Sequence, residues 1–372
     1  MAKAKKKLLP KDFEVLLKQG DLESLKAVFE TCEVDARGGV FGQTALAFND
    51  CPDQLARWLV INGADLSAGD GYGDTPLHSR ARHWQGRIEI LLELGADIHH
   101  GENLRGTPLH SAAGSYIVNT ARVLIDHGAR VDALNSEKQT PMAYALQRCN
   151  NTDIVAMAQL ADLFLRSSER VPTKKKSFVR SLFGSGKTQE IKTTPELKAF
   201  VTRIGTNFEF HRSNFNSEHL AATSAALDRL YILFDVSPVP HRAMHDRKSP
   251  IIAKSVRWQD RHQELWELLV PSSGASETVQ GEVVRISGKI RNELEGNGGI
   301  NWDVGFRKMA DAFLLHISSG ISLPPTEVVQ ARALVAEVKK KRGDTGRLCE
   351  LAVNWVALNP KPAKLPPPDY AR

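Results

Sequence analysis

The sequence has few cysteines, and their spacing excludes two classes of protein. Four occur in 372 residues, at Cys32, Cys51, Cys149 and Cys349, without a CxxC pair and without a histidine at ligand spacing. Zinc sites and disulfide frameworks depend on such spacings. We therefore expect no metal site and no disulfide framework, and the cysteine usage fits a reducing compartment.

Long apolar runs are also missing. No segment approaches the roughly 20 apolar residues that a membrane-spanning helix needs. The N-terminal segment MAKAKKKLLPKDFEVLL has the basic opening of an export signal, but Pro10, Lys11, Asp12 and Glu14 interrupt its apolar run. We therefore expect a cytoplasmic protein.

Signatures of catalysis are missing as well. His241 and His245 in HRAMHD lie in a proline-flanked loop without the glutamate of an H-E-x-x-H site, and no G-x-S-x-G elbow occurs. The acids Glu293 and Glu295 are two residues apart, which places them on different sides of a helix. We expect no catalytic residue and no cofactor, with an enzyme in the C-terminal half as the open alternative.

The stretch LFGSGKT, residues 182–188, resembles the end of a phosphate-binding loop. The full motif G-x-x-x-x-G-K-[ST] needs a glycine where Ser181 stands, and a buried strand where the basic stretch KKKSFVRSLF lies. Both departures argue against nucleotide binding by this stretch.

The excess of positive over negative charge is concentrated in two segments. The chain carries a formal net charge of +6. Four lysines fall within residues 3–7, and six basic groups fall within residues 171–195 (Lys174, Lys175, Lys176, Arg180, Lys187 and Lys192), so the remainder is slightly acidic. A basic tail and a basic linker argue against a nucleic-acid-reading domain, whose charge would lie on a folded face.

A repeat runs through the first half of the chain. Equivalent threonines stand at Thr44, Thr75, Thr107 and Thr140, at intervals of 31, 32 and 33 residues, and Gly63, Gly95 and Gly128 recur in step. Two of the repeats contain the tetrad TPLH intact, at residues 75–78 and 107–110.

This pattern resembles the ankyrin repeat, a helix pair of about 33 residues with a T-P-L-H-x-A signature. The threonine can cap the first helix, the proline fits its first turn, and the later glycine suits the end of the second helix. The resemblance implies an all-α solenoid of about five helix pairs over residues 8–168. The segment EVLLKQGDLESLKAVFE and residues 139–168 are its atypical terminal units.

Within such a stack most of the repeated residues hold neighbouring units together. Leucines and isoleucines of the repeats form the apolar contacts between units: Leu77, Leu91, Leu92, Leu109, Leu124 and Ile125. His78 and His110 occupy equivalent positions, so we expect internal hydrogen bonds for both rather than a metal-binding role.

The resemblance also implies where a partner would bind, since ankyrin stacks hold partners on the inner helices and the loop tips. The inner positions are Phe48, Ser79, Arg82, His83, Ser111, Ser115, Tyr144 and Arg148. The tip positions are Asp70, Tyr72, His99, His100, Asn103, Arg105, Asn135 and Lys138. Arginine, tyrosine and histidine often carry binding energy at protein interfaces. The alternative is that each is an ordinary solvated residue.

Composition divides the chain into four segments. We expect a basic disordered tail at 1–10, an ankyrin-repeat stack at 11–170, a basic flexible linker at 171–195, and an all-helical domain with a proline-rich C-terminal tail at 196–372. The linker alternates basic residues with Phe178, Val179, Leu182 and Phe183, so binding of a membrane surface or a partner through 174–187 is its alternative role.

The second half has the apolar spacing of helices. Its stretch LVPSSGASETVQGEVVRISGKIRNELEGNGGINWD, residues 269–303, faintly resembles a segment of uncharacterised bacterial proteins. Polar and aromatic residues gather near one glycine-rich stop and are the candidate second surface: Arg285, Glu293, Asn297, Asn301, Trp302 and Asp303. The alternative is a purely local structure, in which Gly296 ends one helix and Asn301 or Asp303 caps the next.

These observations predict a non-enzymatic protein that binds another protein through the ankyrin-like stack. The narrower hypothesis, which depends on the resemblance of the second half, is a bacterial immunity or inhibitor protein that occludes a toxin or effector. The alternatives are an adaptor for a membrane surface or nucleic acid that uses the lysine-rich segments, and an enzyme housed in the helical half.

Overall fold

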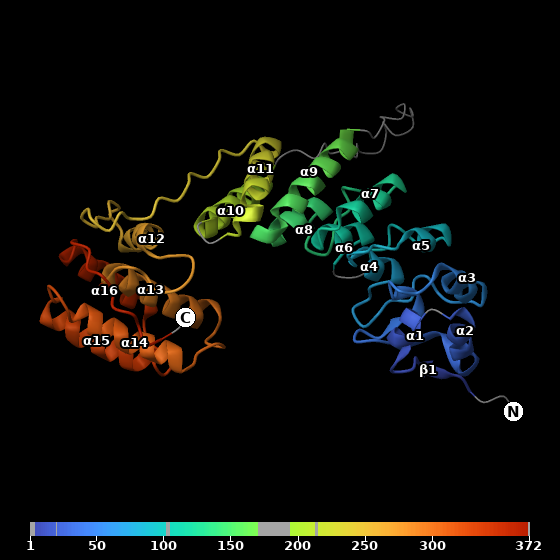
Figure 1. Ribbon diagram of the computed structural model, residues 1–372, viewed down its shortest axis with the longest axis horizontal. Helices are drawn as coiled ribbons and strands as arrows, with labels where there is room; N and C mark the ends of the chain where they lie inside the picture. The colour runs from blue at the N-terminus through green and yellow to red at the C-terminus, as the bar shows by residue number, and fades with distance from the viewer. Residues whose placement is uncertain (1–3, 20, 102–104, 170–193, 213–214, 371–372) are drawn as a thin grey trace, which may run out of the picture. The chain divides into compact units, whose positions relative to one another are not determined.

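The computed structural model describes residues 4–19, 21–101, 105–169, 194–212 and 215–370. Internal contacts divide the chain into two compact units (Figure 1). The first unit contains Met1–Asn207 and Ser217–Val239, and the second contains Phe208–Asn216 and Pro240–Arg372.

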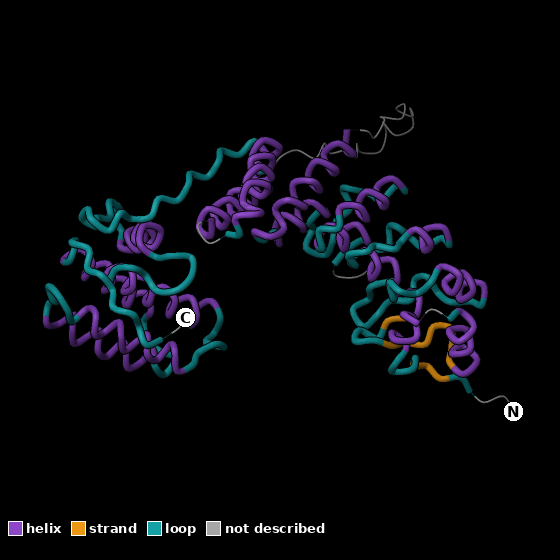
Figure 2. Tube along the Cα trace, viewed as in Figure 1, coloured by secondary structure: helices purple, strands orange, loops and turns teal. Residues whose placement is uncertain are grey.

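The first unit begins with a small three-stranded sheet, which Figure 2 shows near the N-terminus. β1 (Lys6–Leu8) pairs in parallel with β2 (Cys32–Gly38), and β2 pairs antiparallel with β3 (Gln43–Thr44). Helices α1 (Phe13–Gln19) and α2 (Leu22–Thr31) connect β1 to β2.

The prediction of a disordered tail over residues 1–10 is wrong for the part that the structure describes. The Lys5 ammonium donates a hydrogen bond of 2.7 Å to the carbonyl of Phe29, and Leu9 is buried. The lysines dominate the composition of this segment, but one leucine and the backbone pairing of β1 suffice to order it.

Helix pairs follow the sheet in a row, as the repeat predicts (Figure 1). Their inner elements are η1 (Ala45–Ala47), α4 (Pro76–Ala81), α6 (Pro108–Gly114) and α8 (Pro141–Arg148). Their outer elements are α3 (Asp53–Ile61), α5 (Glu89–Glu93), α7 (Val118–Asp126), and η2 (Asn151–Asp153) with α9 (Ile154–Glu169). Helix α4 packs on α6, and α6 packs on α8.

The repeated threonines and glycines have the local roles that the sequence predicts. Thr75 and Thr107 form capping boxes with the histidine three residues later, and a proline occupies the first turn of each helix. Gly63, Gly95 and Gly128 have φ angles of 92°, 93° and 94°, a left-handed geometry that favours glycine.

The prediction of internal hydrogen bonds for His78 and His110 is confirmed. The Nδ1 atom of His78 lies 2.8 Å from the Thr75 hydroxyl, and its Nε2 atom lies 2.9 Å from the carbonyl of Gly106 in the next repeat. His110 repeats this arrangement, with Nε2 3.0 Å from the carbonyl of Gln139. Each buried ring therefore closes its own helix cap and joins two repeats.

Two further helices follow, α10 (Pro195–His211) and α11 (Ser217–Phe234). Helix α11 and α10 as far as Asn207 continue the first unit, whereas the last turn of α10, from Phe208, belongs to the second. Helix α11 packs along α9, where the Arg229 guanidinium donates to both carboxylate oxygens of Asp162 at 3.1 and 2.5 Å. The Arg203 guanidinium on α10 donates to the carbonyls of Leu146 and Gln147, both at 2.9 Å.

The domain boundary expected at residue 196 therefore differs from the division in the structure. The basic stretch 171–195, of which the structure describes only residues 194 and 195, stands between α9 and α10 in the sequence of one unit. A change of composition along the chain marks a connection between helices, but it carries no information about the helix on which the next segment packs.

The second unit is helical, as the apolar spacing predicts. It contains α12 (Trp258–Leu269), α13 (Val279–Arg291), α14 (Val304–Ile317), α15 (Pro325–Val338) and α16 (Thr345–Leu358). A π-helical turn, η5 (Asn292–Gly296), directly follows α13. Helix α13 is the centre of this unit because it contacts α12, α14 and α16 and is buried along most of its length.

A buried charged group holds the C-terminal segment against α13. Glu282 and Arg285 are fully buried and form a two-bond ion pair at 2.8 and 2.7 Å. The Tyr370 hydroxyl donates to the same carboxylate at 2.8 Å, as does the backbone N–H of Ser276 at 2.9 Å. Burial alone would raise the pKa of Glu282, but Arg285 and these donors hold it below its ordinary value.

Acidification should destabilise the stack through its bridging histidines. Burial lowers the pKa of His78 to about 4 and also lowers that of His110. The unfolded chain takes up these protons near its ordinary pKa of 6.5, so the stability is full above that pH and is lost as the pH falls toward 4. We expect His78 alone to cost about 2 to 3 kcal/mol between about pH 7 and pH 4.5 in denaturant unfolding.

His78→Gln and His110→Gln should each flatten this pH dependence, because glutamine does not titrate. The matched control is His99→Gln, since His99 is exposed in a loop. Equal pH slopes for all three variants would contradict the assignment.

Removing the buried carboxylate charge should destabilise the second unit strongly. We expect Glu282→Gln to cost about 3 to 5 kcal/mol in the free energy of unfolding, because it leaves Arg285 buried without a counter-charge. Tyr370→Phe removes one hydrogen bond to a charged group and should cost about 1 to 3 kcal/mol. Chemical denaturation measures both values. The control is Glu337→Gln, whose exposed ion pair with Lys340 should contribute less than about 1 kcal/mol.

Candidate functional site

Neighbouring loop tips of the first unit are joined through their backbones. The N–H of Gly71 donates to the carbonyl of Phe41 at 2.9 Å. The Arg37 guanidinium donates to the carbonyls of Gly42 at 3.0 Å and Gly69 at 2.5 Å. The loop before β3 and the loop before α4 therefore form one bonded assembly.

These tips, together with the loop before α6, carry a row of side chains that we call the tip row: Phe41, Tyr72 and Arg105. The Phe41 and Tyr72 rings meet edge to face at 5.9 Å, and the Arg105 guanidinium lies 5.3 Å from the centre of the Tyr72 ring. Phe41 is 50% exposed and Tyr72 is 60% exposed. Three successive tips thus present a continuous aromatic and cationic surface to solvent.

A buried carboxylate lies behind the tip row. Asp74 is inaccessible to solvent and forms ion pairs with Arg105, at 3.4 Å, and with Arg82 at the end of α4. Both arginine side chains remain partly exposed. Asp74 therefore limits the motion of two cations that stay available at the surface, one on a tip and one on an inner helix.

A hollow of about 390 Å³ adjoins the tip row, and we call it the α1–α4 hollow. Its lining includes Phe41, Phe48, Ser79, Arg82 and His83, together with Glu14 and Lys18 from α1 and Asp50. Phe41 belongs both to this lining and to the tip row, and Arg82 of the lining shares the Asp74 carboxylate with Arg105 of the tip row. The lining carries both signs of charge around an aromatic side, a composition that suits protein contacts better than a single-sign groove.

Two more aromatic side chains, one exposed and one half-buried, lie on or directly after the inner helices. Trp84, in the loop after α4, is 74% exposed and lies 6.0 Å from the His83 ring. The Arg148 guanidinium lies 5.2 Å from the centre of the half-buried Tyr144 ring on α8. A side chain at Gly114 would collide with Tyr144, so this glycine makes room for the ring.

The structure brings some of the sequence-predicted residues together and separates others. Ser79, Arg82 and His83 share the α1–α4 hollow, and Tyr72 and Arg105 share the tip row. Five other predicted positions do not line the hollow: exposed His99 and Lys138, and half-buried His100, Ser111 and Ser115. Asn103 lies outside the described residues.

The expectation of exposure is wrong for three predicted positions. Phe48 is 6% exposed and packs against the ring of Phe13 at 5.6 Å, so only part of it reaches the hollow. Asp70 and Asn135 are buried because each side-chain oxygen accepts hydrogen bonds from backbone N–H groups of its own loop, two and four residues on, at 2.8 to 3.0 Å. They shape the tips instead of extending from them.

The candidate second surface of the C-terminal half is also corrected, because half of its residues are buried. Arg285 belongs to the internal ion pair, Trp302 stacks on Phe306 at 5.0 Å, and Glu293 is 4% exposed. The Glu293 carboxylate accepts hydrogen bonds from the side chain of Asn297 at 3.0 Å and the backbone of Asn301 at 2.6 Å.

The helix stop at Gly296 and the cap at Asp303 that the local alternative predicts are both present. The Asp303 carboxylate accepts the N–H of Phe306 at 3.1 Å and so caps α14. Asn297, Asn301 and Asp303 are exposed, but the helix stop and cap account for their positions.

Sequence reasoning missed Phe41, Asp74 and Trp84. A signal for Phe41 was present, because Phe41 stands three residues before Thr44 as Tyr72 stands three before Thr75. The repeat register therefore places two aromatic residues at the same tip position. Asp74 carries no such signal, since its role depends on arginines 8 and 31 residues away.

Stacked helix pairs with capped inner helices and bonded loop tips define a class of repeat solenoid. The family model for ankyrin repeats (3 copies) matches residues 81–159, so this part of the chain carries ankyrin repeats. Ankyrin repeats are a protein–protein interaction module. No curated protein matches the chain.

The part of the chain that the structure describes lacks two kinds of feature. Within it, no helix combines the length and apolar character required to cross a membrane. Among the same residues, no three His, Cys, Asp or Glu side chains gather into a group that could hold a metal ion.

Replacing Asp74 by asparagine should loosen the surface without unfolding it. The change leaves Arg82 and Arg105 without their shared carboxylate, and we expect a loss of about 1 to 3 kcal/mol in thermal or chemical unfolding. Asp126→Asn is the control, because Asp126 is exposed at the end of α7. If both variants melt alike, the buried carboxylate does not organise this surface.

Proposed function

We propose that the chain is a non-enzymatic binding protein that holds a partner protein against the tip row and the α1–α4 hollow. The observation that carries this proposal is the continuous exposed surface of Phe41, Tyr72 and Arg105. The loops of Phe41 and Tyr72 are hydrogen-bonded to each other, and Arg105 is held by its ion pair with Asp74. Tyrosine and arginine dominate the binding energy of many interfaces, and residues on a rigid support lose little entropy on binding.

The chemistry of the surface favours a partner segment with an apolar anchor beside an acidic group. An apolar side chain would enter the hollow against Phe41 and the exposed edge of Phe48, and a carboxylate would meet Arg82 or Arg105. Trp84 and His83 extend the available contact area on the adjoining loop. The apolar and charged contacts together would determine the orientation of the bound partner as well as its affinity.

The narrower form of the proposal is a bacterial immunity or inhibitor protein that neutralises a toxin or effector by covering its active surface. Occlusion needs a preformed surface and no catalytic group, which suits the tip row. The proposal includes a cytoplasmic location, where the four buried free cysteines would stay reduced.

The competing functions predict a different dependence of binding affinity on salt concentration. An adaptor that binds a membrane surface or nucleic acid through 174–187, a segment outside the described residues, would lose affinity steeply as salt rises. A packed protein interface loses much less. Affinity measured across a salt series therefore distinguishes the adaptor from the protein-binding function. A third function, an enzyme in the C-terminal half, would be supported by catalytic turnover that persists in a variant without the tip-row side chains.

Truncating the tip row should abolish partner capture. We expect the full-length double variant Tyr72→Ala/Arg105→Ala to bind the protein partner recovered from native cells about a hundredfold or more weakly, because it removes two central contact residues. Calorimetry or surface plasmon resonance measures the loss.

The matched control is Ile61→Ala/Arg122→Ala, which removes an exposed apolar side chain and an exposed arginine from α3 and α7. The control variant should keep the wild-type melting temperature, and the tip-row variant should stay folded with a melting temperature lowered only by the loss of the Arg105–Asp74 ion pair. Partner binding that is unchanged in the tip-row variant, or equally weakened in the control, would contradict the proposal.

A further inference from the structure

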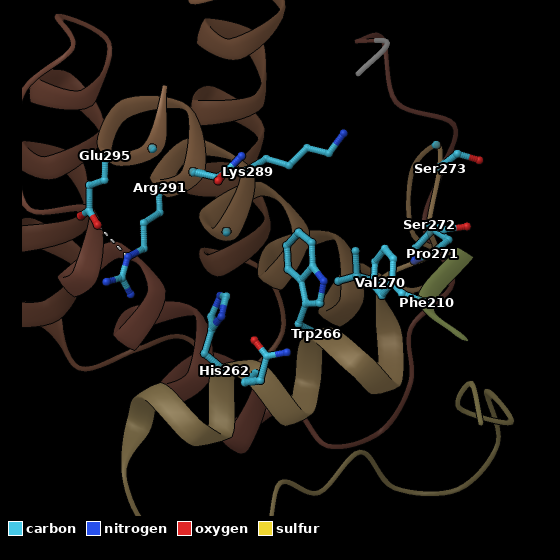
Figure 3. A pocket seen from close by; sticks show the side chains of 15 residues that line it. Phe210, His262, Trp266, Val270, Pro271, Ser272, Ser273, Lys289, Arg291 and Glu295 are labelled. Carbon is cyan, nitrogen blue, oxygen red and sulfur yellow. Dashed lines mark hydrogen bonds and ion pairs between the residues drawn. The ribbon is translucent and has the colours of Figure 1, made fainter. Parts of the chain in front are cut away.

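The second unit contains a larger hollow that is separate from the surface described above. We call it the α12–α13 hollow, and its volume is about 710 Å³, within the range of small-molecule sites. Helix α12 supplies one wall, α13 with the π-helical turn supplies another, and the loop 270–274 closes a side (Figure 3).

An aromatic group forms the floor of this hollow. The half-buried Trp266 ring lies nearly parallel to Phe210, with centroids 6.5 Å apart and planes at 13°. His262, one turn earlier on α12, lies on the same side of the helix, 6.4 Å from the Trp266 ring. Gly288 permits this arrangement, because a side chain there would collide with the Trp266 ring. Planar rings of this kind stack on flat ligands.

The charge of the hollow is positive at neutral pH. Lys289 and Arg291 outnumber Glu295 among the charged residues that line it. Glu295 is neutralised by its 3.0 Å ion pair with Arg291, which Figure 3 shows as a dashed line. His262 adds no charge, because burial and the nearby Arg291 lower its pKa to about 4. A small anion would therefore meet a net attraction here.

Two uncommon backbone conformations occur among the residues that line the hollow. Asn292, Glu295 and Gly296 of the π-helical turn line it, and π-helical turns are rare and frequent at functional sites. On the opposite side stand Ser272, Ser273 and Gly274, of which Gly274 has a φ of 76°. Backbone N–H groups of a glycine-containing loop and a lysine ammonium are groups that hydrogen-bond phosphate oxygens.

We propose that the α12–α13 hollow binds a nucleotide, with the base stacked on Trp266 and the phosphate held near Lys289 and the loop 270–274. The proposal joins three independent features: an aromatic floor, an excess of positive charge and a glycine- and serine-containing loop within one cavity of suitable size. It does not involve the stretch LFGSGKT, and it is independent of partner binding by the first unit.

Calorimetric titration of the full-length protein with the four ribonucleoside monophosphates tests the proposal. We expect at least one to bind saturably with a Kd below about 1 mM. The corresponding nucleoside and inorganic phosphate alone should each bind at least about tenfold more weakly, because each lacks one of the two contacts. Absence of saturable binding by all four nucleotides would overturn the proposal.

Variants assign the binding to this hollow. Trp266→Ala and Lys289→Ala should each weaken nucleotide binding about tenfold or more, and Trp266→Phe should weaken it less because it keeps a planar ring. The control is Lys361→Ala, an exposed lysine of the same unit that does not line the hollow. Melting curves identify a variant that fails to fold. If Trp266→Ala fails to fold, Trp266→Phe and Lys289→Ala still test the site. Unchanged nucleotide affinity in Lys289→Ala would refute it.

Discussion

The stack depends on one repeated interaction, the bridge from a buried histidine to the backbone of the next repeat. In His78 one ring nitrogen closes the cap of its own helix, and the other meets the carbonyl of Gly106. The bridge determines how far apart two repeats lie and how they are turned, because a hydrogen bond tolerates little variation in distance or angle. Leu77 and Leu109 supply the apolar contact, but apolar contact alone has no direction.

The bridge also explains why the loop tips can carry a surface. Gly106 and Gln139, which accept the two bridges, stand at the ends of loops that lead into the next inner helix. Asp70 and Asn135 then shape the loops from inside through bonds to backbone N–H groups. Side chains such as Tyr72 are therefore presented by backbone that is hydrogen-bonded at both ends, which reduces the entropy lost when a partner binds.

The repeat and its helices could be predicted because they depend on residues near one another in sequence. Thr75, Pro76 and His78 act within one helical turn, so the motif alone predicts the cap and the role of the histidine. Exposure at the tips could not be predicted in the same way. Asp70 has the residue type of a contact group, and only the backbone geometry of its loop shows that the carboxylate turns inward.

The second unit was harder to predict because its structure depends on contacts that are distant in sequence. Glu282 and Arg285 have the spacing of an ordinary surface pair on a helix. They are buried because α12, α14 and α16 pack around α13, and Tyr370, 88 residues beyond Glu282, completes the hydrogen bonding of the carboxylate. The α12–α13 hollow could not be predicted for the same reason. A glycine within a helix ordinarily indicates reduced helix stability, and only the structure shows that Gly288 leaves space for the Trp266 ring. Helical periodicity predicts which elements form, whereas cavities and buried charges arise only when distant elements meet.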